Sequence, residues 1–246
     1  MGSLFEKWKK GLKKKVHPFC TAIVPAAGKS SRMGGEDKMF APLCGVPVLA
    51  RTLTVLDQAV LVDEIVVAAQ PEKLEEVAAL VSSAGIRKPV RVVEGGASRA
   101  ESVLLAALEA NEDVEYLAVH DGARPLVLPE QVDDLIRLGQ RTYAARAVPV
   151  TDTVKVADLS GLVLSTPDRS TLFAVQTPQV FQANLLKAAL QSAIAAEAPL
   201  TDDCSAVERL GKEVYLTPGW RENIKITTPE DLSVAELFLR RREVQA

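Results

Sequence analysis

Four short apolar segments, alternating with amphipathic helical patterns, constrain the fold of this 246-residue chain more than any other feature. The segments are rich in apolar residues, as strands buried on both faces are, and comprise FCTAIV (19–24), EIVVAA (64–69), VRVVE (90–94) and EYLAVHD (115–121). The helical patterns lie at 46–59, 71–85, 98–111 and 129–140. This alternation predicts an α/β fold, in which right-handed crossovers build a parallel sheet with helices on both faces.

The alternating pattern ends after residue 144. Residues 145–175 contain two extended runs around a turn-rich centre, Asp158–Gly161, which predicts a hairpin that leaves the sheet. The remaining expected elements are a helix over 182–197, a short helix after Thr201, strands over 213–217 and 223–227, and a helix from Pro229. The sequence therefore predicts one three-layer α/β/α, Rossmann-like domain over 17–246, with a mostly parallel twisted sheet and a protruding β-hairpin arm at about 149–172.

The histidine and cysteine content excludes several kinds of site. The chain has only two histidines, His17 and His120, so a histidine-rich metal site is excluded. Its three cysteines, Cys20, Cys44 and Cys204, fit neither a disulfide framework nor a CxxC metal site, and they indicate a reducing cytoplasm. No apolar run approaches the roughly 20 residues needed to span a bilayer, and the N-terminus lacks the apolar segment of a signal peptide, so we expect a cytoplasmic protein.

Charge is distributed unevenly along the chain. Residues 1–15 contain six lysines and one glutamate, a net charge of +5, so the net charge of −3 leaves −8 on the remainder. An acidic body argues against a general nucleic-acid binder. In the basic extension over 1–16, an apolar helical face would be formed by Leu4, Phe5, Trp8 and Leu12. That face would suit a membrane surface, and a solvated extension is the alternative that we favour.

The segment PAAGKSSRMGGEDK (25–38) places three cations, Lys29, Arg32 and Lys38, in a small-residue loop directly after the first predicted strand. Ligands bind at the carboxyl ends of strands in such sheets. The loop is not a Walker phosphate-binding loop, because Ile23 stands where that motif needs glycine, and it lacks GxGxxG. Small residues would let the backbone approach a triphosphate, whose developing charge the cations would stabilise. A solvated loop with scattered surface cations is the alternative.

This loop resembles the signature loop of nucleotidyltransferases of the sugar-nucleotide pyrophosphorylase superfamily. Further segments share the resemblance: EGGASRAESV (94–103), VHDGARPLV (119–127), PVTDTVKV (149–156), and TDDCSAVERLG (201–211) followed by NIKITTPEDL (223–232). Together, from about Cys20 to Leu239, they resemble the 2-C-methyl-D-erythritol 4-phosphate cytidylyltransferase family of the non-mevalonate isoprenoid pathway. The resemblance implies transfer of CMP from CTP to methylerythritol phosphate, with release of pyrophosphate and with Mg²⁺ on the triphosphate.

The resemblance also implies which residues bind the nucleotide. Arg32 and Lys38 match the two cations that stabilise charge at the α-phosphate. The positions that match the backbone around the nucleotide, and around its cytosine, are Pro25, Ala26, Ala27, Gly28, Gly95, Gly96 and Ser102. Ala97 stands where some relatives have an acidic residue, so only its backbone is expected to contribute. A turn between strand and helix is the alternative role of the two glycines.

A second set of positions matches residues that bind the sugar phosphate or the metal. Asp121 is expected to orient Mg²⁺ or the ribose, and the positions matching substrate contacts are Arg124, Thr153, Arg169, Thr201 and Lys225. In the family the arm reaches over a second subunit, so Thr153 and Arg169 are expected in the partner's site of a homodimer. The alternatives are an Asp121–Arg124 ion pair in a turn, a helix N-cap at Thr201 or Asp202, and simple exposure of Arg169 and Lys225.

Two other functions compete with this one. Ribitol-5-phosphate cytidylyltransferases share the fold and the loop chemistry, although PAAG and TDDCSAVERLG look more like the isoprenoid enzyme. A nucleotide-binding regulator without turnover would be expected to lack a catalytic cation, yet the chain retains all four, namely Arg32, Lys38, Arg169 and Lys225.

The nucleophile of the implied reaction is a phosphate oxygen with a second pKa near 6, so it needs no general base. The scarcity of histidine agrees with that.

Overall fold

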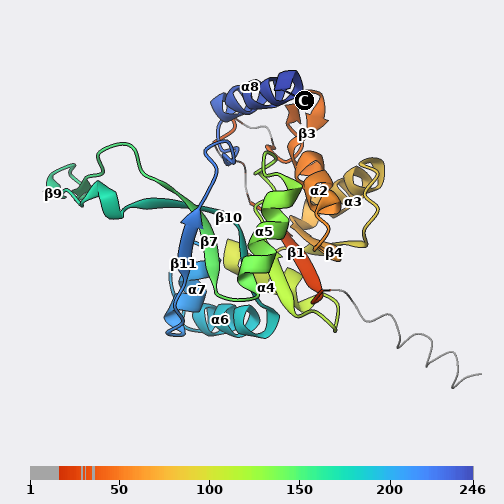
Figure 1. Ribbon diagram of the computed structural model, residues 1–246, viewed down its shortest axis with the longest axis horizontal. Coiled ribbons are helices and arrows are strands. Elements are labelled where there is room, and N and C mark those ends of the chain that lie inside the picture. The colour runs from red at the N-terminus through yellow and green to blue at the C-terminus, as the bar shows by residue number, and fades with distance from the viewer. Residues whose placement is uncertain (1–16, 29, 31, 35–36, 246) are drawn as a thin grey trace, which may run out of the picture.

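The computed structural model describes residues 17–28, 30, 32–34 and 37–245, so the prediction for the basic extension over 1–16 lies outside the described residues. Within them, seven strands form one sheet in the order β11-β7-β10-β6-β1-β4-β5 (Figure 1). The strands are β1 (Cys20–Pro25), β4 (Glu64–Ala69), β5 (Val90–Glu94), β6 (Tyr116–Val119), β7 (Ala144–Pro149), β10 (Phe173–Gln182) and β11 (Tyr215–Pro218). Neighbouring strands are parallel except around β10, which is antiparallel to β6 and β7. The predicted fold class is confirmed.

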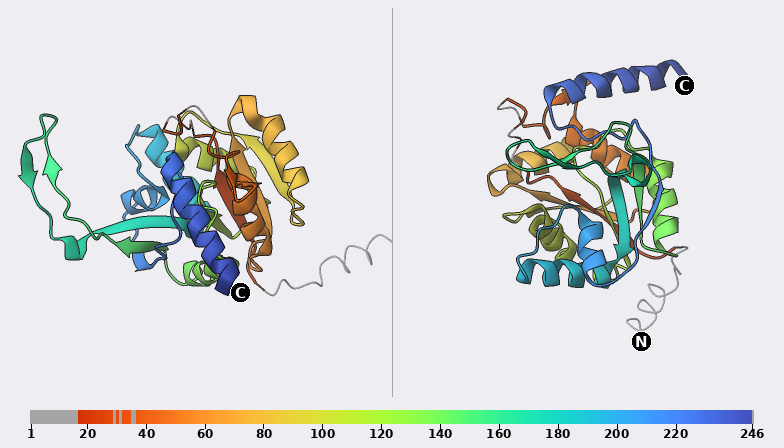
Figure 2. Two further views of the ribbon diagram at one scale, coloured as in Figure 1. Left: turned by 90° about the horizontal axis from the view of Figure 1, so that it is seen from above. Right: turned by 90° about the vertical axis from the view of Figure 1, so that its left-hand side faces the viewer.

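Helices cover both faces of the sheet, which makes three layers (Figures 1 and 2). One core cluster lies under α2 (Val48–Gln58), α3 (Leu74–Ser83), α5 (Pro129–Gly139) and α8 (Pro229–Gln245). The other lies under α4 (Arg99–Leu108), α6 (Ala183–Ala195) and α7 (Asp203–Arg209). Along β1, Ala22 and Val24 belong to the first cluster and Ile23 to the second, because successive strand residues point to opposite faces. This explains why β1 has apolar residues on both of its faces.

Two helix N-termini near the carboxyl end of the sheet are fixed by side-chain caps. Ser98 caps α4: its Oγ accepts a hydrogen bond from the Glu101 N–H at 3.1 Å, and the Glu101 carboxylate accepts one from the Ser98 N–H. Asp202 caps α7 by accepting a hydrogen bond from the Ser205 N–H at 2.9 Å. Of the two N-cap candidates from the sequence, Asp202 therefore takes this role and Thr201 precedes it.

Two predicted features of the second half of the chain are wrong. Residues 223–227 do not form a strand. Their backbone bonds elsewhere: the Ile226 N–H donates to the Ala123 carbonyl, and the Thr227 N–H donates to the Asp231 carboxylate. The extended run expected to end at residue 175 continues through β10 to Gln182. Proline cannot donate a hydrogen bond to a strand ladder, and Pro178 lies where the pairing of β10 with β7 is interrupted, between Val175 and Gln179.

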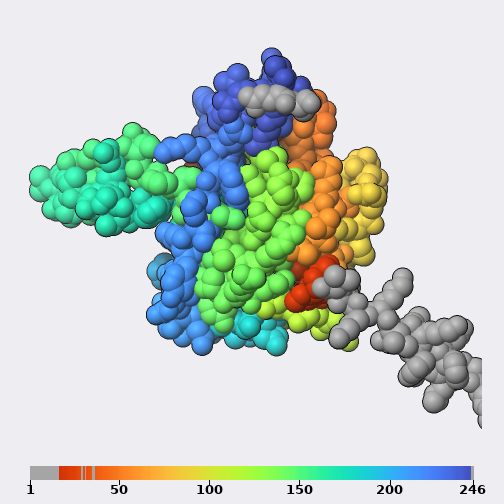
Figure 3. All heavy atoms as spheres, in the orientation of Figure 1, coloured from red at the N-terminus to blue at the C-terminus, as the bar shows by residue number. Residues whose placement is uncertain are grey.

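The predicted hairpin arm is present between β7 and β10. It carries the short antiparallel strands β8 (Val156–Ala157) and β9 (Val163–Ser165) and the single turn η2 (Arg169–Thr171). Asp158 closes the turn by accepting hydrogen bonds from the N–H groups of Ser160 and Leu162. Figure 3 shows the arm standing away from the body of the molecule. Three leucines on it are well exposed, namely Leu159, Leu162 and Leu164.

Shorter elements complete the chain. The strands β2 (Pro42–Leu43) and β3 (Val46–Pro47) pair with each other before α2, and the turn η1 (Pro71–Lys73) precedes α3. Among the described residues, no helix has the length and apolar character to cross a bilayer.

Replacing Leu135 by alanine is expected to lower the free energy of unfolding by about 2–5 kcal/mol, because it leaves a cavity in the core. Leu135 lies on α5 and is 0% exposed. The matched control is Leu237→Ala on α8, where the leucine is 65% exposed and the loss should be below about 0.5 kcal/mol. Urea unfolding followed by circular dichroism measures both. Equal losses would contradict the described packing of α5 on the sheet.

Candidate active site

A cavity of about 640 Å³ opens at the carboxyl ends of β1, β4, β5 and β6. Ten of the residues singled out in the sequence line it: Pro25, Ala27, Gly28, Lys38, Gly95, Gly96, Ala97, Ser102, Asp121 and Lys225. Ala26 is buried beside it, and its N–H bonds to the Ala68 carbonyl at 2.7 Å. The fold therefore gathers almost all of the expected nucleotide-binding positions around one cavity.

The close approach of two loops explains the glycine at position 95. A Cβ atom there would lie 2.5 Å from the Ala27 Cβ and 3.2 Å from the Ala69 carbonyl oxygen. Ser102 is buried on α4, and its hydroxyl accepts a hydrogen bond from the Gly96 N–H at 3.1 Å. The glycine loop is thus held from both sides, and its backbone forms one wall of the cavity.

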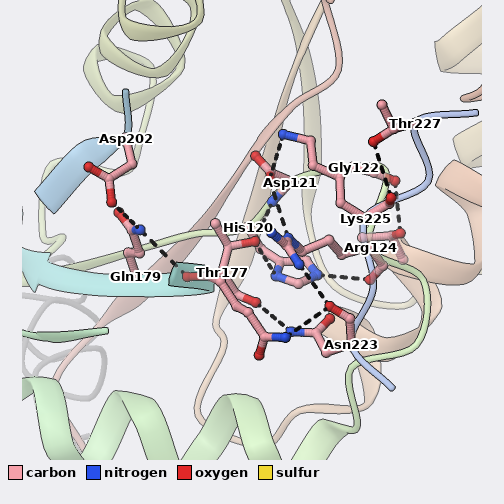
Figure 4. A network of polar contacts seen from close by, with 12 residues as sticks. His120, Asp121, Gly122, Arg124, Thr177, Gln179, Asp202, Asn223, Lys225 and Thr227 are labelled. Carbon is pink, nitrogen blue, oxygen red and sulfur yellow. Dashed lines mark hydrogen bonds and ion pairs between the residues drawn. The ribbon is translucent and has the colours of Figure 1, made fainter. Parts of the chain in front are cut away.

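Asp121, two residues after the end of β6, contacts three cations, and Figure 4 shows two of them, Arg124 and Lys225. Its Oδ2 lies 2.9 Å from the Lys225 Nζ and 3.4 Å from the Arg124 Nε, and its Oδ1 lies 3.2 Å from an Arg99 Nη2. Burial alone would raise the pKa of Asp121, but Arg99, Lys225 and Arg124 together hold that pKa well below its usual range. The sequence offered an Asp121–Arg124 ion pair in a turn as an alternative to a role in binding. This ion pair is present, and it is part of a larger cluster of charges.

Lys38 brings a further positive charge to the same cavity. Burial lowers its pKa, and the nearby charges of Lys225 and Arg32 lower it further, against the opposing effect of Asp121. Arg32 is exposed in the loop and does not line the cavity, although its charge acts on Lys38. This concentration of positive charge suits a polyanionic ligand such as a triphosphate.

A second cavity, of about 280 Å³, adjoins the first on the other side of Asp121. Three of the expected substrate-binding residues, Arg124, Thr201 and Lys225, line it. Because Asp121 and Lys225 border both cavities, a ligand in one would lie next to a ligand in the other. This arrangement suits a transfer between two bound substrates.

Comparison with known proteins decides the family. The family model described as IspD, 2-C-methyl-D-erythritol 4-phosphate cytidylyltransferase, matches residues 20–241. This chain belongs to the IspD family. The curated 2-C-methyl-D-erythritol 4-phosphate cytidylyltransferase of Caldanaerobacter subterraneus subsp. tengcongensis is 42% identical over 224 residues, which cover 90% of this chain and 99% of that protein. The one from Symbiobacterium thermophilum is 45% identical, covering 89% and 92%.

Solved structures agree with the assignment to the IspD family. The 4-diphosphocytidyl-2C-methyl-D-erythritol synthase of Anaerococcus prevotii superposes with a TM-score of 0.77 at 28% identity, covering 91% of this chain and 99% of that one. The 2-C-methyl-D-erythritol 4-phosphate cytidylyltransferase of Thermus thermophilus gives a TM-score of 0.72 at 30% identity, covering 90% and 99%. The likeness thus extends over nearly the whole described chain.

The described residues of this IspD-family chain do not fit a metal site built by the protein alone. Both carboxylate oxygens of Asp121 already contact cations. Nowhere in the part of the chain that the structure describes do three or more histidine, cysteine or acidic side chains gather as metal ligands would. Mg²⁺ in such enzymes can be held largely by substrate phosphates and water. We therefore treat the ion as part of the nucleotide substrate.

Thr153 and Arg169 lie on the arm and line neither cavity of their own chain. Both are exposed, and an Arg169 Nη1 donates a hydrogen bond to the Thr151 carbonyl at 2.7 Å. The fold thus brings together the expected residues of the body except Arg32, whereas these two lie on the arm, which projects from the body (Figure 1).

Sequence reasoning missed the buried polar groups behind Asp121 (Figure 4). The Thr177 Oγ1, on β10, accepts a hydrogen bond from the Asp121 N–H at 3.0 Å and lies 3.1 Å from the His120 Nδ1. The Asn223 amide donates to the Thr177 carbonyl, and the Asn223 carbonyl accepts from Arg124 at 2.7 Å. The only local signal was the histidine beside Asp121 in VHDGARP, since the other partners come from distant segments.

Acid is expected to destabilise the protein through His120. Burial lowers its pKa from 6.5 to about 4, against the raising effect of its hydrogen bond to the Arg124 carbonyl and of Asp121. As the pH falls, His120 is therefore protonated at a higher pH in the unfolded chain than in the folded protein. His120 contributes stability that is complete above about pH 6.5 and is lost by up to about 1.4 kcal/mol per pH unit down to about pH 4.

The difference in pH dependence between the wild type and His120→Gln tests this expectation. Urea unfolding at pH values from 7 down to 4 should give a smaller fall in stability for the variant, because glutamine does not titrate. Parallel curves would show that His120 does not set the acid sensitivity.

Proposed function

We propose that this chain transfers CMP from CTP to 2-C-methyl-D-erythritol 4-phosphate. The products are 4-diphosphocytidyl-2-C-methyl-D-erythritol and pyrophosphate, in the non-mevalonate route to isoprenoid precursors. The observation that carries the proposal is the pair of adjoining cavities that share Asp121 and Lys225, one lined by a small-residue backbone and Lys38 and the other by Arg124 and Thr201. Family membership supplies the identity of the two substrates.

In the proposed nucleotide site, the backbone of Pro25–Gly28 and of Gly95 and Gly96 approaches the nucleotide, with Ser102 holding the second loop. Ala26 is buried behind this loop, and its N–H is bonded to the Ala68 carbonyl of β4, so it fixes the course of the loop backbone. Lys38 and Arg32 neutralise the charge that develops on the non-bridging oxygens of the α-phosphate. Such preorganised charge is the largest catalytic effect available to a reaction of this kind.

The proposed reaction is an in-line displacement. A phosphate oxygen of methylerythritol phosphate forms a bond to the α-phosphorus of CTP, and the bond from that phosphorus to the bridging oxygen of pyrophosphate breaks. The leaving pyrophosphate takes the electron pair of that bond. The attacking oxygen is already largely deprotonated at neutral pH, because the second pKa of the phosphate is about 6. Lys225, Arg124 and Thr201 hold its phosphate group in the second cavity, which fixes the line of attack.

Mg²⁺ enters the proposed reaction bound to the triphosphate, where it neutralises charge. Asp121 was expected to orient this ion or the ribose. Its contacts favour a different role, because a carboxylate that binds Arg99, Arg124 and Lys225 sets the positions of those cations. We therefore propose that Asp121 borders the nucleotide and organises the cations, rather than serving as a main metal ligand.

A homodimer is part of the proposal, with Thr153 and Arg169 completing the partner's site. The arm at 149–172 is the proposed dimerisation element. It projects from the body and exposes Leu159, Leu162 and Leu164, a surface that a second copy would cover. A cytoplasmic location is also proposed, in line with three cysteines that are all unpaired.

The test is pyrophosphate release by the purified protein with CTP, comparing methylerythritol phosphate with ribitol 5-phosphate, each with and without Mg²⁺. Mg²⁺-dependent turnover with the first substrate alone is the expected result. Turnover with ribitol 5-phosphate alone would keep the loop chemistry but assign the chain to glycan synthesis. Binding of CTP without turnover on either substrate would favour a regulator.

A further inference from the structure

Asp203 has no part in the reaction just described, yet it is buried next to the cation cluster. It is the first residue of α7 and 0% exposed. Its Oδ2 accepts a hydrogen bond from an Arg99 Nη2 at 2.9 Å, and its Oδ1 has no hydrogen-bond partner among the described residues. Burying a carboxylate is costly unless it is paired: burial raises the pKa of Asp203, and the Arg99 guanidinium opposes that rise and favours the charged form.

Arg99 connects Asp203 to the proposed active site. The Arg99 guanidinium lies between two carboxylates, with its Nη2 3.2 Å from the Asp121 Oδ1 and its Nε 3.3 Å from the same oxygen. The other oxygen of Asp121 binds Lys225 at 2.9 Å. A continuous series of ion pairs therefore runs from the buried Asp203 through Arg99 and Asp121 to Lys225, which borders both cavities.

The charges in this cluster explain what Asp203 does there. Three cations, Arg99, Arg124 and Lys225, share two carboxylates, Asp121 and Asp203. Without the charge of Asp203, all three cations would depend on Asp121 alone. Arg99 would then compete with Lys225 for that carboxylate, which would weaken the contact that fixes the position of Lys225.

The Asp203 carboxylate is not needed to cap the N-terminus of α7. The Asp202 side chain and Ser205 already cap that helix, and the Gln179 side-chain oxygen accepts the N–H groups of Asp203 and Cys204 at 3.1 Å. These bonds use the backbone of Asp203 and leave its carboxylate to Arg99.

We propose that Asp203 is a positioning residue, which holds Arg99 so that Asp121 keeps Lys225 directed at the sugar phosphate. The inference rests on the proposed function for its substrate. It predicts a selective effect: the second substrate, bound by Lys225, should be affected more than CTP, which is bound chiefly by the loops around Gly28 and Gly95.

Asp203→Asn is the first test, because asparagine keeps the shape and removes the charge. We expect kcat/KM for methylerythritol phosphate to fall by about 10–100-fold, while the Kd for CTP from calorimetry changes by less than about threefold. The control is Ser205→Ala, which weakens the cap of the same helix without touching Arg99. Equal losses for the two variants, or an equal loss of CTP binding, would overturn the proposal.

Arg99 provides a second test that does not depend on Asp203→Asn folding well. Arg99→Lys keeps the charge but cannot bridge two carboxylates as a guanidinium does, so it should show the same selective loss. If Asp203 acts through Arg99, adding Asp203→Asn to Arg99→Lys should cost less than about threefold more, since the two changes affect one interaction. Losses that multiply would show that Asp203 acts independently.

A crystal structure of the Asp203→Asn variant decides the inference without any turnover. We expect Arg99 to have moved away from residue 203 toward Asp121, and the Asp121–Lys225 pair to have lengthened. An unchanged Arg99–Asp121–Lys225 arrangement would overturn the inference. Wild-type protein that binds CTP but turns over neither substrate would instead contradict the proposed function, and this crystal structure would still settle the role of Asp203.

Discussion

Replacing Lys38 by alanine is expected to lower kcat by about 10²–10³-fold and to change the Kd for CTP by less than about fivefold. Lys38 lines the nucleotide cavity, and burial together with the charge of Lys225 lowers its pKa. Its charge interacts most strongly with the α-phosphate when negative charge accumulates there, which happens in the transition state. Single-turnover rates with saturating CTP, and calorimetric titration of CTP without the second substrate, measure the two effects separately.

The matched control for this change is Lys73→Ala. Lys73 lies in η1, next to Pro71 and Glu72 of the cavity wall, but its Nζ is bound to the Glu76 carboxylate at 2.6 Å. Its loss should leave kcat within about twofold of the wild type, as exposed ion pairs contribute little. If Lys38→Ala weakened CTP binding as much as it lowered kcat, Lys38 would be a ground-state contact and the assignment to the α-phosphate would fail.

Mixing two inactive variants, Lys38→Ala and Arg169→Ala, is expected to restore activity. In the proposed homodimer the arm of one subunit completes the site of the other. A mixed dimer then has one site with both changes and one site with neither. Random exchange of subunits makes half of the dimers mixed, so about one quarter of all sites should regain wild-type activity. Pyrophosphate release before and after the two proteins are unfolded and refolded together measures the recovery.

The control for this mixing experiment uses two changes on the same arm. When Thr153→Ala is mixed with Arg169→Ala, every site receives an altered arm, so no activity should be gained. Recovery with Lys38→Ala but not with Thr153→Ala would place Arg169 in the partner's site. Absence of recovery in both mixtures, from dimers shown to have exchanged subunits, would mean that Arg169 acts within its own chain or not at all.

The sequence was sufficient for the architecture because central strands of this sheet, such as β1 and β4, are buried on both faces. Segments such as EIVVAA, which is β4 from end to end, have no polar alternation that could suggest another structure. β10 was recognised only in part, because its long-range partners β6 and β7 tolerate Pro178 through an interruption in pairing that no local pattern reveals. Residues 223–227 alternate like a strand but bond to a loop and to Asp231 instead.

In the site, too, residues marked by a local pattern could be predicted, and residues that depend on long-range contacts could not. Positions such as Gly95 and Lys38 could be predicted because they follow strands whose carboxyl ends meet at one edge. Arg99, Thr177 and Asn223 could not, since each acts on Asp121 or Arg124 from a segment far away in the chain. Contacts of this kind depend on how separate elements pack, and the spacing of residues along one sequence does not reveal that packing.

The place where the arm joins the sheet has a consequence for how this chain can change. β7 and β10 are paired at the base of the arm, with Pro149 opposite Phe173. No described residue from 150 to 172 belongs to either core cluster. Substitutions in the arm other than at Thr153 and Arg169 are therefore expected to alter the proposed dimer contact without lowering the stability of the core.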